Sequence, residues 1–264
     1  SPDRVKSLGK ELAGKMSPKL GRIFGSMEKK HLVTVGSSDK MYYGSFQIYL
    51  NSCDSPYIFV NGEGSEYDVL TLMHEFGHFT SAYYNHGSTG GNDEAEVASS
   101  ALELLTLKYA DGVFDSETAA SIGKSGILSI ISSLVECAAY SEFENLVYSD
   151  KALTAEKCNG YFRQVAEEYG ISGGDGGYLY WVMVNHLFEY PYYVAGYSVS
   201  ADVALQIYES CDGSIDPYLD FIKLARSGSF SENIKTAGLE SPFSEGRAEK
   251  AAAAIQKLTE KYFS

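Results

Sequence analysis

The chain has 264 residues, and its 44% hydrophobic content is enough for one substantial core. With 21 basic and 35 acidic residues its formal net charge is −14, which argues against nucleic acid and anionic membranes as partners and weakly favours basic or neutral peptides. We find no apolar run near the roughly 18–20 residues of a membrane helix and no apolar signal segment. We therefore expect neither a membrane-spanning helix nor a signal sequence.

The cysteines are not spaced as in a disulfide framework or a metal site. No two of them lie within five residues of each other, and two fall in helical patterns. We therefore predict reduced thiols in a cytoplasmic protein. The four residues are Cys53, Cys137, Cys158 and Cys211.

The N-terminal part changes its pattern twice. The first thirty residues contain several glycines and lysines and predict at best a weak or interrupted helix. Between Val33 and Val60 the pattern becomes extended, because Tyr42–Leu50 alternates and is rich in aromatic residues, and Pro56–Val60 forms a second run. We predict a small β-sheet there, followed by a mainly helical region.

The segment after residue 65 has a helical apolar period and carries two histidines one turn apart. His74 and His78 lie on a different face from the apolar stripe, where both imidazoles can bind one cation. Glu75 is rotated by about 100° from His74, so it can reach a water on that cation without binding the metal. The alternative to a metal site is that the two histidines simply lie on the surface of an amphipathic helix. The strict spacing of the motif makes this alternative weaker. The predicted buried stripe is Val69, Leu72, Met73, Phe76, Thr80 and Tyr83.

A third metal ligand is expected from the next helix, predicted over Ala95–Tyr109 after a glycine-rich loop. Glu94 lies in the first turn, where the helix dipole favours negative charge in any case. Glu96 enters an apolar run, where an unpaired carboxylate would be unfavourable, so we predict it as the ligand and keep Glu94 as the alternative. Glu103 lies two turns further along the same face and is predicted as a partner of the ligands.

More helices are predicted through the rest of the chain, without an internal repeat or a domain linker. The glycine-rich stretch Gly173–Gly177 is predicted as a mobile loop, because it lacks the lysine and strand-to-helix context of a phosphate site. The helices are expected near residues 117–148, 154–169, 178–190, 199–210, 215–226, 230–237 and 245–262.

A cluster of tyrosines follows His186. Tyrosine packs well at half-buried positions, so such a cluster can be core or interface. The cluster can also take part in catalysis. A phenol with a pKa near 10 keeps its proton at neutral pH and can donate a hydrogen bond to a substrate carbonyl oxygen on which negative charge develops. Gly196 interrupts the cluster, so we expect a bent segment there rather than a straight helix. The tyrosines are Tyr190, Tyr192, Tyr193 and Tyr197.

Taken in order, these segments resemble the oligoendopeptidase F and thimet oligopeptidase family of zinc metallopeptidases, nearer to the bacterial oligoendopeptidase branch. The resemblance is strongest over Asp68–His78, where the family has a near-identical run into its zinc helix. The histidine motif alone is shared by many families, whereas the ordered set of segments is specific. The other similar segments are Pro56–Asn61, Ala95–Ser99, Tyr140–Glu144, Leu153–Glu156 and Trp181–Tyr197.

The resemblance implies a mainly α, zincin-type catalytic domain with a small β-sheet near its N-terminal part. It implies one Zn²⁺ per chain, held by His74, His78 and Glu96, and so selects Glu96 over Glu94.

It also implies roles for the tyrosine segment. His186, Tyr193 and Tyr197 match the positions that contact the substrate and the oxyanion in the family. Tyr190 and Tyr192 are left as packing or peripheral pocket residues.

The chain departs from the family in length. Whole members are about twice as long and close a deep channel with an N-terminal helical lobe. The resemblance therefore implies that residues 1–264 correspond to the C-terminal catalytic portion without that lobe, through truncation or in a shortened protein. A restriction to short peptides does not follow for such a portion. At Phe79–Ala82 relatives often carry another histidine, and we expect no effect of this difference on the metal.

The predicted activity is hydrolysis of peptide bonds in oligopeptides. Glu75 takes a proton from the metal-activated water and passes it to the leaving amine. The substrate backbone is expected to add as a strand beside Tyr42–Leu50. Two alternatives stay open: a fragment that binds zinc or peptide without turnover, and a zinc hydrolase of a non-peptide substrate, which fits the tyrosine segment less well. The oligomeric state is not predicted.

Overall fold

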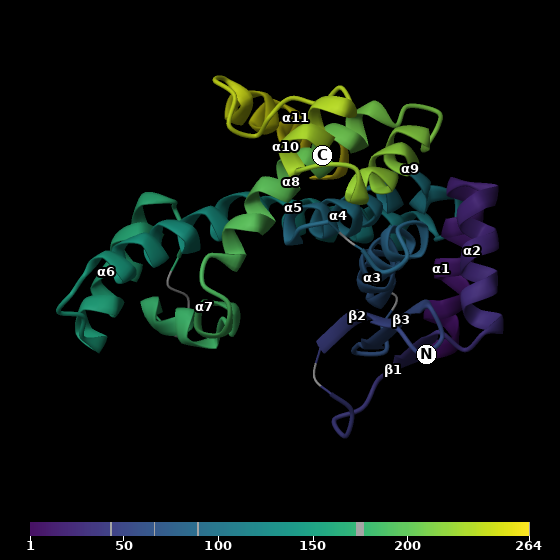
Figure 1. Cartoon of the computed structure of the whole chain (residues 1–264), viewed down its shortest axis with the longest axis horizontal. Helices are drawn as coiled ribbons and strands as arrows, with labels where there is room; N and C mark the ends of the chain where they lie inside the picture. Colours follow the sequence, from purple (N-terminus) through teal and green to yellow (C-terminus); the bar gives the residue numbers. More distant parts are fainter. Residues whose placement is uncertain (43, 66, 89, 173–176, 264) are drawn as a thin grey trace.

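The computed structural model describes residues 1–42, 44–65, 67–88, 90–172 and 177–263. Within these ranges the chain is mainly helical and has one three-stranded sheet in its N-terminal part, which confirms the predicted fold class. In Figure 1 the sheet and the first helices lie on one side, and α6 (Ala155–Glu168) and α7 (His186–Glu189) lie on the other. Two long helices, α5 (Ser116–Ser149) and α8 (Tyr193–Ser210), connect the two sides.

Two helices form the N-terminal part, α1 (Pro2–Met16) and α2 (Pro18–Lys29). The predicted interruption lies at Ser17, where the backbone is extended and the hydroxyl accepts a hydrogen bond from a backbone N–H in the first turn of α2. Both helices are fully formed rather than weak, because each buries an apolar stripe despite its glycines. At Gly9 a Cβ atom would lie 2.8 Å from a methyl group of Leu72, so this glycine allows α1 to pack closely.

The sheet contains β1 (Val33–Gly36), β2 (Gly44–Leu50) and β3 (Ser55–Asn61) in the order β1-β3-β2. β1 is parallel to the central strand β3, and β2 is antiparallel to it. Alternate residues of β3, among them Ile58 and Val60, are buried on the side where α3 packs. The two extended runs predicted from the sequence are confirmed, and β2 is an edge strand.

The helices α3 (Asp68–Tyr84) and α4 (Asn92–Tyr109) pack side by side in the centre of the molecule. The predicted apolar stripe of α3 is buried except at Tyr83, which is 48% exposed. A short 3₁₀ helix, Ala110–Gly112, follows α4.

Helix α5 contributes to both hydrophobic clusters of the described chain. Its first half, with Ile122 and Ile127, belongs to the main cluster around α3 and α4. Its second half, with Tyr140 and Phe143, belongs to a smaller cluster that includes α6 and the start of α8. By length and composition α5 could cross a membrane, so the prediction that no segment reaches this limit was wrong. In this fold α5 packs along α6 and α8.

The region predicted as one helix over residues 178–190 is not continuous. It consists of a 3₁₀ segment, Gly177–Met183, and the single turn α7. The backbone of Tyr178 is non-helical, and Pro191 is the second residue after α7, which a proline cannot continue. Of the predicted glycine-rich loop, residues 173–176 lie outside the described residues.

The prediction of a bent segment between Tyr193 and Tyr197 was wrong, because both lie in the regular helix α8. Gly196 is used for packing instead. A Cβ atom at Gly196 would lie 2.7 Å from Oδ1 of Asp93, so glycine allows α8 to approach the start of α4.

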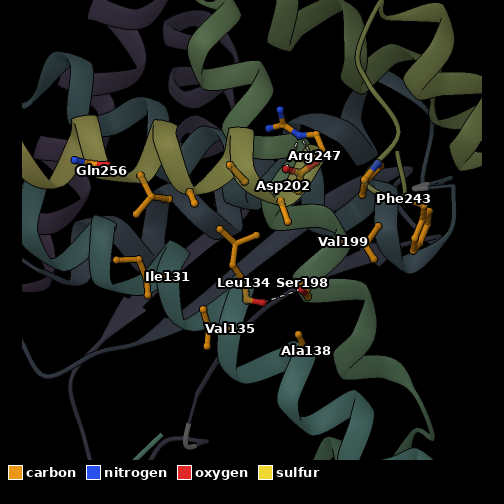
Figure 2. A pocket seen from close by; sticks show the side chains of 15 residues that line it. Ile131, Leu134, Val135, Ala138, Ser198, Val199, Asp202, Phe243, Arg247 and Gln256 are labelled. Carbon is orange, nitrogen blue, oxygen red and sulfur yellow. Dashed lines mark hydrogen bonds and ion pairs between the residues drawn. The ribbon is translucent and has the colours of Figure 1, made fainter. Parts of the chain in front are cut away.

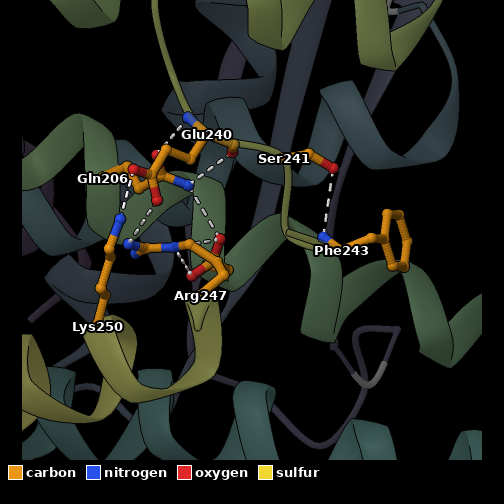
Figure 3. A network of polar contacts seen from close by, with 7 residues as sticks. Gln206, Glu240, Ser241, Phe243, Arg247 and Lys250 are labelled. Carbon is orange, nitrogen blue, oxygen red and sulfur yellow. Dashed lines mark hydrogen bonds and ion pairs between the residues drawn. The ribbon is translucent and has the colours of Figure 1, made fainter. Parts of the chain in front are cut away.

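The C-terminal helices pack on α8 and α5, and a buried ion pair joins α11 to α8 (Figure 3). Nε of Arg247 donates to both carboxylate oxygens of Asp202, at 2.8 and 3.0 Å. Gln206 extends this network by donating to Asp202 and to the backbone oxygen of Glu240. The elements are α9 (Asp216–Ile222), a 3₁₀ helix (Lys223–Arg226), α10 (Phe230–Thr236) and α11 (Arg247–Phe263).

A cavity of about 630 Å³ lies between α5, α8 and α11 (Figure 2). Most of its lining side chains are apolar, including Leu134, Val199 and Ala251. None of the residues that the sequence predicts for the site lines this cavity, so it lies on a different face of α5 and α8 from the candidate site.

Candidate active site

Helices α3 and α4 are in close backbone contact at Gly77. A Cβ atom added there would lie 2.4 Å from the backbone oxygen of Ala98 and 2.5 Å from Cα of Ser99. Any side chain at this position would push the helices apart, so glycine is required between the two histidines. The close packing brings His74 and His78 against the first turns of α4.

The three predicted metal ligands converge at this crossing. Oε2 of Glu96 lies 3.6 Å from Nε2 of His74 and 3.7 Å from Nε2 of His78. In the part of the chain that the structure describes, these three residues form the group that could hold a metal ion, with ligand atoms within 4.8 Å of one another. Tetrahedral zinc with ligands at about 2.0–2.2 Å separates those ligands by about 3.3–3.6 Å. The separations of Glu96 from the two histidines, 3.6 and 3.7 Å, lie at and just above the upper end of this range.

The alternative ligand, Glu94, lies outside this group. Its carboxylate accepts a hydrogen bond from the backbone N–H of Gly91 at 2.8 Å and so caps the N-terminus of α4. Glu96 is 5% exposed and is turned toward the histidines. The structure thus brings Glu96, and not Glu94, to His74 and His78, while its role as a ligand stays a prediction.

Glu103 lies behind His74, on the side away from Glu96. Nδ1 of His74 is 3.0 Å from Oε2 of Glu103, so the imidazole N–H can donate to the carboxylate while Nε2 faces Glu96. Burial alone would lower the pKa of His74, but the hydrogen bond and charge of Glu103 outweigh it and raise this pKa to about 9. A carboxylate in this place fixes the imidazole orientation and strengthens it as a ligand.

Glu75 is buried next to the three grouped residues and has a free oxygen. Its side chain is 6% exposed, and Oε2 has no hydrogen-bond partner among the described residues. Burial is the main reason why the pKa of Glu75 rises to about 7, with the charges of Glu96 and Glu103 adding to it. Burial also lowers the pKa of His78 to about 4, so that His78 is neutral at pH 7. Glu75 therefore has the protonation range that a general base needs.

His186 and the two predicted tyrosines form one aromatic group facing Glu96. The ring of His186 lies 4.8 Å from that of Tyr193 and 6.1 Å from that of Tyr197. The hydroxyl of Tyr193 donates to Oε1 of Glu96 at 3.2 Å, and Nδ1 of His186 is buried without a partner in the described chain. Burial, followed by the charge of Glu96, raises the pKa of Tyr193 to about 12 and raises that of Tyr197 as well, so both keep their protons.

Tyr190 and Tyr192 lie at the periphery, with exposed fractions of 58% and 46%. Tyr192 has a left-handed backbone (φ 62°) immediately before α8. Its N–H donates to Oε1 of Glu144 at 2.8 Å, and this contact fixes where α8 begins.

Two features of the site were missed by the sequence analysis. The hydroxyl of Ser99 donates to Oε2 of Glu96 at 3.1 Å, a contact that the spacing of three residues on one helix could have suggested. A small pocket of about 90 Å³ lies beside His74 and Tyr197, and serines of two helices, including Ser100 and Ser133, are among the residues that line it. Nothing in the local sequence indicates this pocket, because it forms only where α4 meets α5.

Comparison with known proteins gives consistent results. The sequence model of peptidase family M3 matches residues 34–252. The chain is 28% identical over 207 residues to oligopeptidase PepF of Bacillus subtilis (strain 168), covering 70% of this chain and 30% of that protein. Among solved structures, PZ peptidase A with an inhibitor superposes with a TM-score of 0.89 at 21% identity, over 99% of this chain and 49% of that one. A protein of Bacillus anthracis strain Ames assigned as oligoendopeptidase F gives a TM-score of 0.82 at 21% identity, over 100% and 46%.

The chain thus spans about half the length of these solved structures and 30% of PepF. The solved structures establish the shared fold, and the sequence model establishes the relationship. That model covers most of the chain, from β1 through the two helices of the candidate site to α11. The chain belongs to peptidase family M3.

Proposed function

We propose that this chain is the catalytic part of a zinc-dependent endopeptidase that hydrolyses peptide bonds in oligopeptides. The observation that carries the proposal is the convergence of His74, His78 and Glu96, with Glu75 beside them, whose Oε2 has no hydrogen-bond partner in the described part of the chain. Two histidines and one carboxylate are a ligand set of catalytic zinc, which leaves a further position for water or substrate. The M3 relationship supports a peptide substrate over other substrates.

The residues of the chain divide the chemistry among them. Zinc held by the three ligands would supply Lewis-acid activation of a water molecule and of the substrate carbonyl. Glu75 accepts the proton of the attacking water and then donates it to the leaving amine. Burial raises the pKa of Glu75 to about 7 in the metal-free chain, and the charge of a zinc ion beside it would lower this pKa, so that Glu75 would be ionised and able to accept the proton.

His186 and Tyr197 are the proposed donors to the substrate. As the peptide carbonyl becomes tetrahedral its oxygen gains negative charge, and preorganised donors stabilise that charge. Tyr197 lines the same small pocket as His74 and keeps its proton, and His186 has a buried nitrogen without a partner among the described residues. Tyr193 belongs to the same group, but its hydroxyl is already engaged by Glu96.

The edge strand β2 is the proposed backbone site for the peptide. Among the described residues it pairs with β3 alone, so its other edge offers backbone N–H and C=O groups for an added strand. Backbone pairing binds a peptide independently of most of the peptide's side chains, which suits an enzyme that acts on varied oligopeptides. We also propose one Zn²⁺ per chain. Because the four cysteines are free, we further propose a cytoplasmic location.

The test is peptide cleavage by the zinc-loaded chain and by Glu75→Gln. Glu75→Gln should keep the metal, because the residue is not a ligand, and should lose about 10²–10⁴ in turnover with the proton transfer. The exposed Glu167 on α6 provides a matched control, since Glu167→Gln should retain full activity. An active Glu75→Gln variant with bound metal would exclude this mechanism, and a zinc-loaded chain without turnover would support the alternative of a binding fragment.

A further inference from the structure

The two oxygens of Glu96 have different surroundings. Oε2 faces the imidazoles of His74 and His78, at 3.6 and 3.7 Å, and also accepts the hydroxyl of Ser99. Oε1 points to α8 and accepts the hydroxyl of Tyr193 at 3.2 Å. One oxygen is therefore presented to the metal position, and the other is held by a residue 97 positions further along the chain.

This asymmetry determines how the carboxylate can coordinate. A glutamate binds a metal ion through one oxygen or through both. Binding through both oxygens of Glu96 would occupy a coordination position that a catalytic zinc site keeps for water or substrate. An O–H donor on Oε1 competes with the metal for that oxygen and so favours binding through Oε2 alone.

The hydroxyl of Tyr193 is held in place by its surroundings. Its ring packs against those of His186, Tyr197 and Tyr190, with centroids 4.8, 5.4 and 6.0 Å away. Tyr193 is also the first residue of α8, whose start is fixed by the contact between Tyr192 and Glu144 described above. The donor is thus preorganised before any metal or peptide binds.

We propose that Tyr193 is a positioning residue for the metal ligand Glu96, which it keeps bound through one oxygen, and that its hydroxyl does not contact the substrate. The proposal rests on the proposed zinc function and refines it. It changes the role that the sequence resemblance implies for Tyr193, and it leaves the oxyanion contact to Tyr197 and His186.

The first test is zinc affinity, measured by competition with a chelator on the metal-free chain. Tyr193→Phe keeps the ring and removes the hydroxyl, and loss of such a partner of a metal ligand lowers affinity about 10- to 100-fold. Tyr190→Phe is the matched control in the same aromatic group and should keep the wild-type affinity. The activity of Tyr193→Phe should recover largely at saturating free zinc, whereas loss of a substrate contact would raise KM at every zinc concentration.

The second test reads the coordination directly. With Co²⁺ in place of zinc, Tyr193→Phe should show weaker visible absorption than the wild type, because added coordination by the second oxygen of Glu96 moves the site away from tetrahedral geometry. A crystal structure of the zinc-loaded wild type should show one oxygen of Glu96 on the metal and the other on Tyr193. This measurement does not depend on whether the variant folds.

The outcomes separate this proposal from the proposed function. Unchanged zinc affinity and an unchanged cobalt spectrum in Tyr193→Phe would overturn it, as would a wild-type structure with both oxygens of Glu96 on zinc. In those cases a zinc-loaded, active wild type would leave the proposed function intact. A chain that binds neither zinc nor cobalt at His74, His78 and Glu96 would overturn both.

Discussion

Replacing Gly77 by alanine tests the idea that close packing of α3 and α4 builds the metal site. The new Cβ atom would lie 2.4 Å from the backbone oxygen of Ala98, whereas ordinary contact begins at 3.4 Å, so the helices must separate by about 1 Å. Overpacking of this kind costs about 1–3 kcal/mol of the free energy of unfolding. The tolerance of metal–ligand distances is only about 0.2 Å, so the separation should also weaken zinc binding. A misplacement of about 1 Å lowers turnover by about 10²-fold.

The assay is urea unfolding of the metal-free chain by circular dichroism, together with zinc titration of the folded chain. Excluding metal from the unfolding experiment is necessary, because bound zinc would add its own stabilisation. Gly160→Ala is the control, since Gly160 is exposed in α6 and a Cβ atom there would meet nothing within 4 Å. That change should stabilise the chain by up to about 1 kcal/mol and leave zinc affinity unchanged. A Gly77→Ala variant with wild-type stability and zinc affinity would refute the reasoning.

Further predictions concern protons and hydrogen bonds at the site. Tyr197→Phe should reduce turnover by about 10²–10³ with unchanged thermal stability. A variant with wild-type turnover in an activity assay and wild-type stability in a melting curve would contradict its role as a donor. Because the pKa of His74 is raised to about 9, the metal-free site carries a proton there at pH 7. Zinc must displace this proton, so zinc affinity should rise with pH up to about 9, and calorimetry in buffers of different ionisation enthalpy should detect its release. Glu103→Gln should lower zinc affinity about 10- to 100-fold, and an unchanged titration would contradict the hydrogen bond to His74. Burial raises the pKa of Glu75 to about 7 in the metal-free chain, so an NMR titration of that chain should show Glu75 losing its proton near neutral pH; loss of the proton near pH 4 would contradict the burial of this carboxylate.

The helical parts of the site were predictable because helical spacing determines which side chains share a face. His74 and His78 one turn apart, and Glu103 two turns after Glu96, lie where the period of 3.6 residues places them. The separate position of Glu94 also follows from a local rule, since the first turn of a helix favours acidic caps.

The remaining features depend on contacts between distant parts of the chain. The hydrogen bond from Tyr193 to Glu96 joins residues 97 positions apart, and a single sequence carries no signal for it. Tyr192 adopts a left-handed backbone whose N–H is bound by the buried Glu144 of α5. This contact makes α8 begin at Tyr193, six residues before the start predicted from the periodicity. From the sequence we expected Gly196 to bend the segment, but in the structure it allows close packing between two helices.

The division of the apolar residues into two clusters, with α5 in both, has a consequence for how the molecule opens. The main cluster holds α3 and α4, and hence His74, His78 and Glu96. The smaller cluster holds α6 and the segment that carries His186. A unit with fewer buried apolar contacts unfolds locally at lower free energy, so backbone amides of α6 and α7 should exchange with deuterium faster than those of α3 and α4. The part of the chain that carries His186 is then expected to open and refold while His74, His78 and Glu96 keep their places.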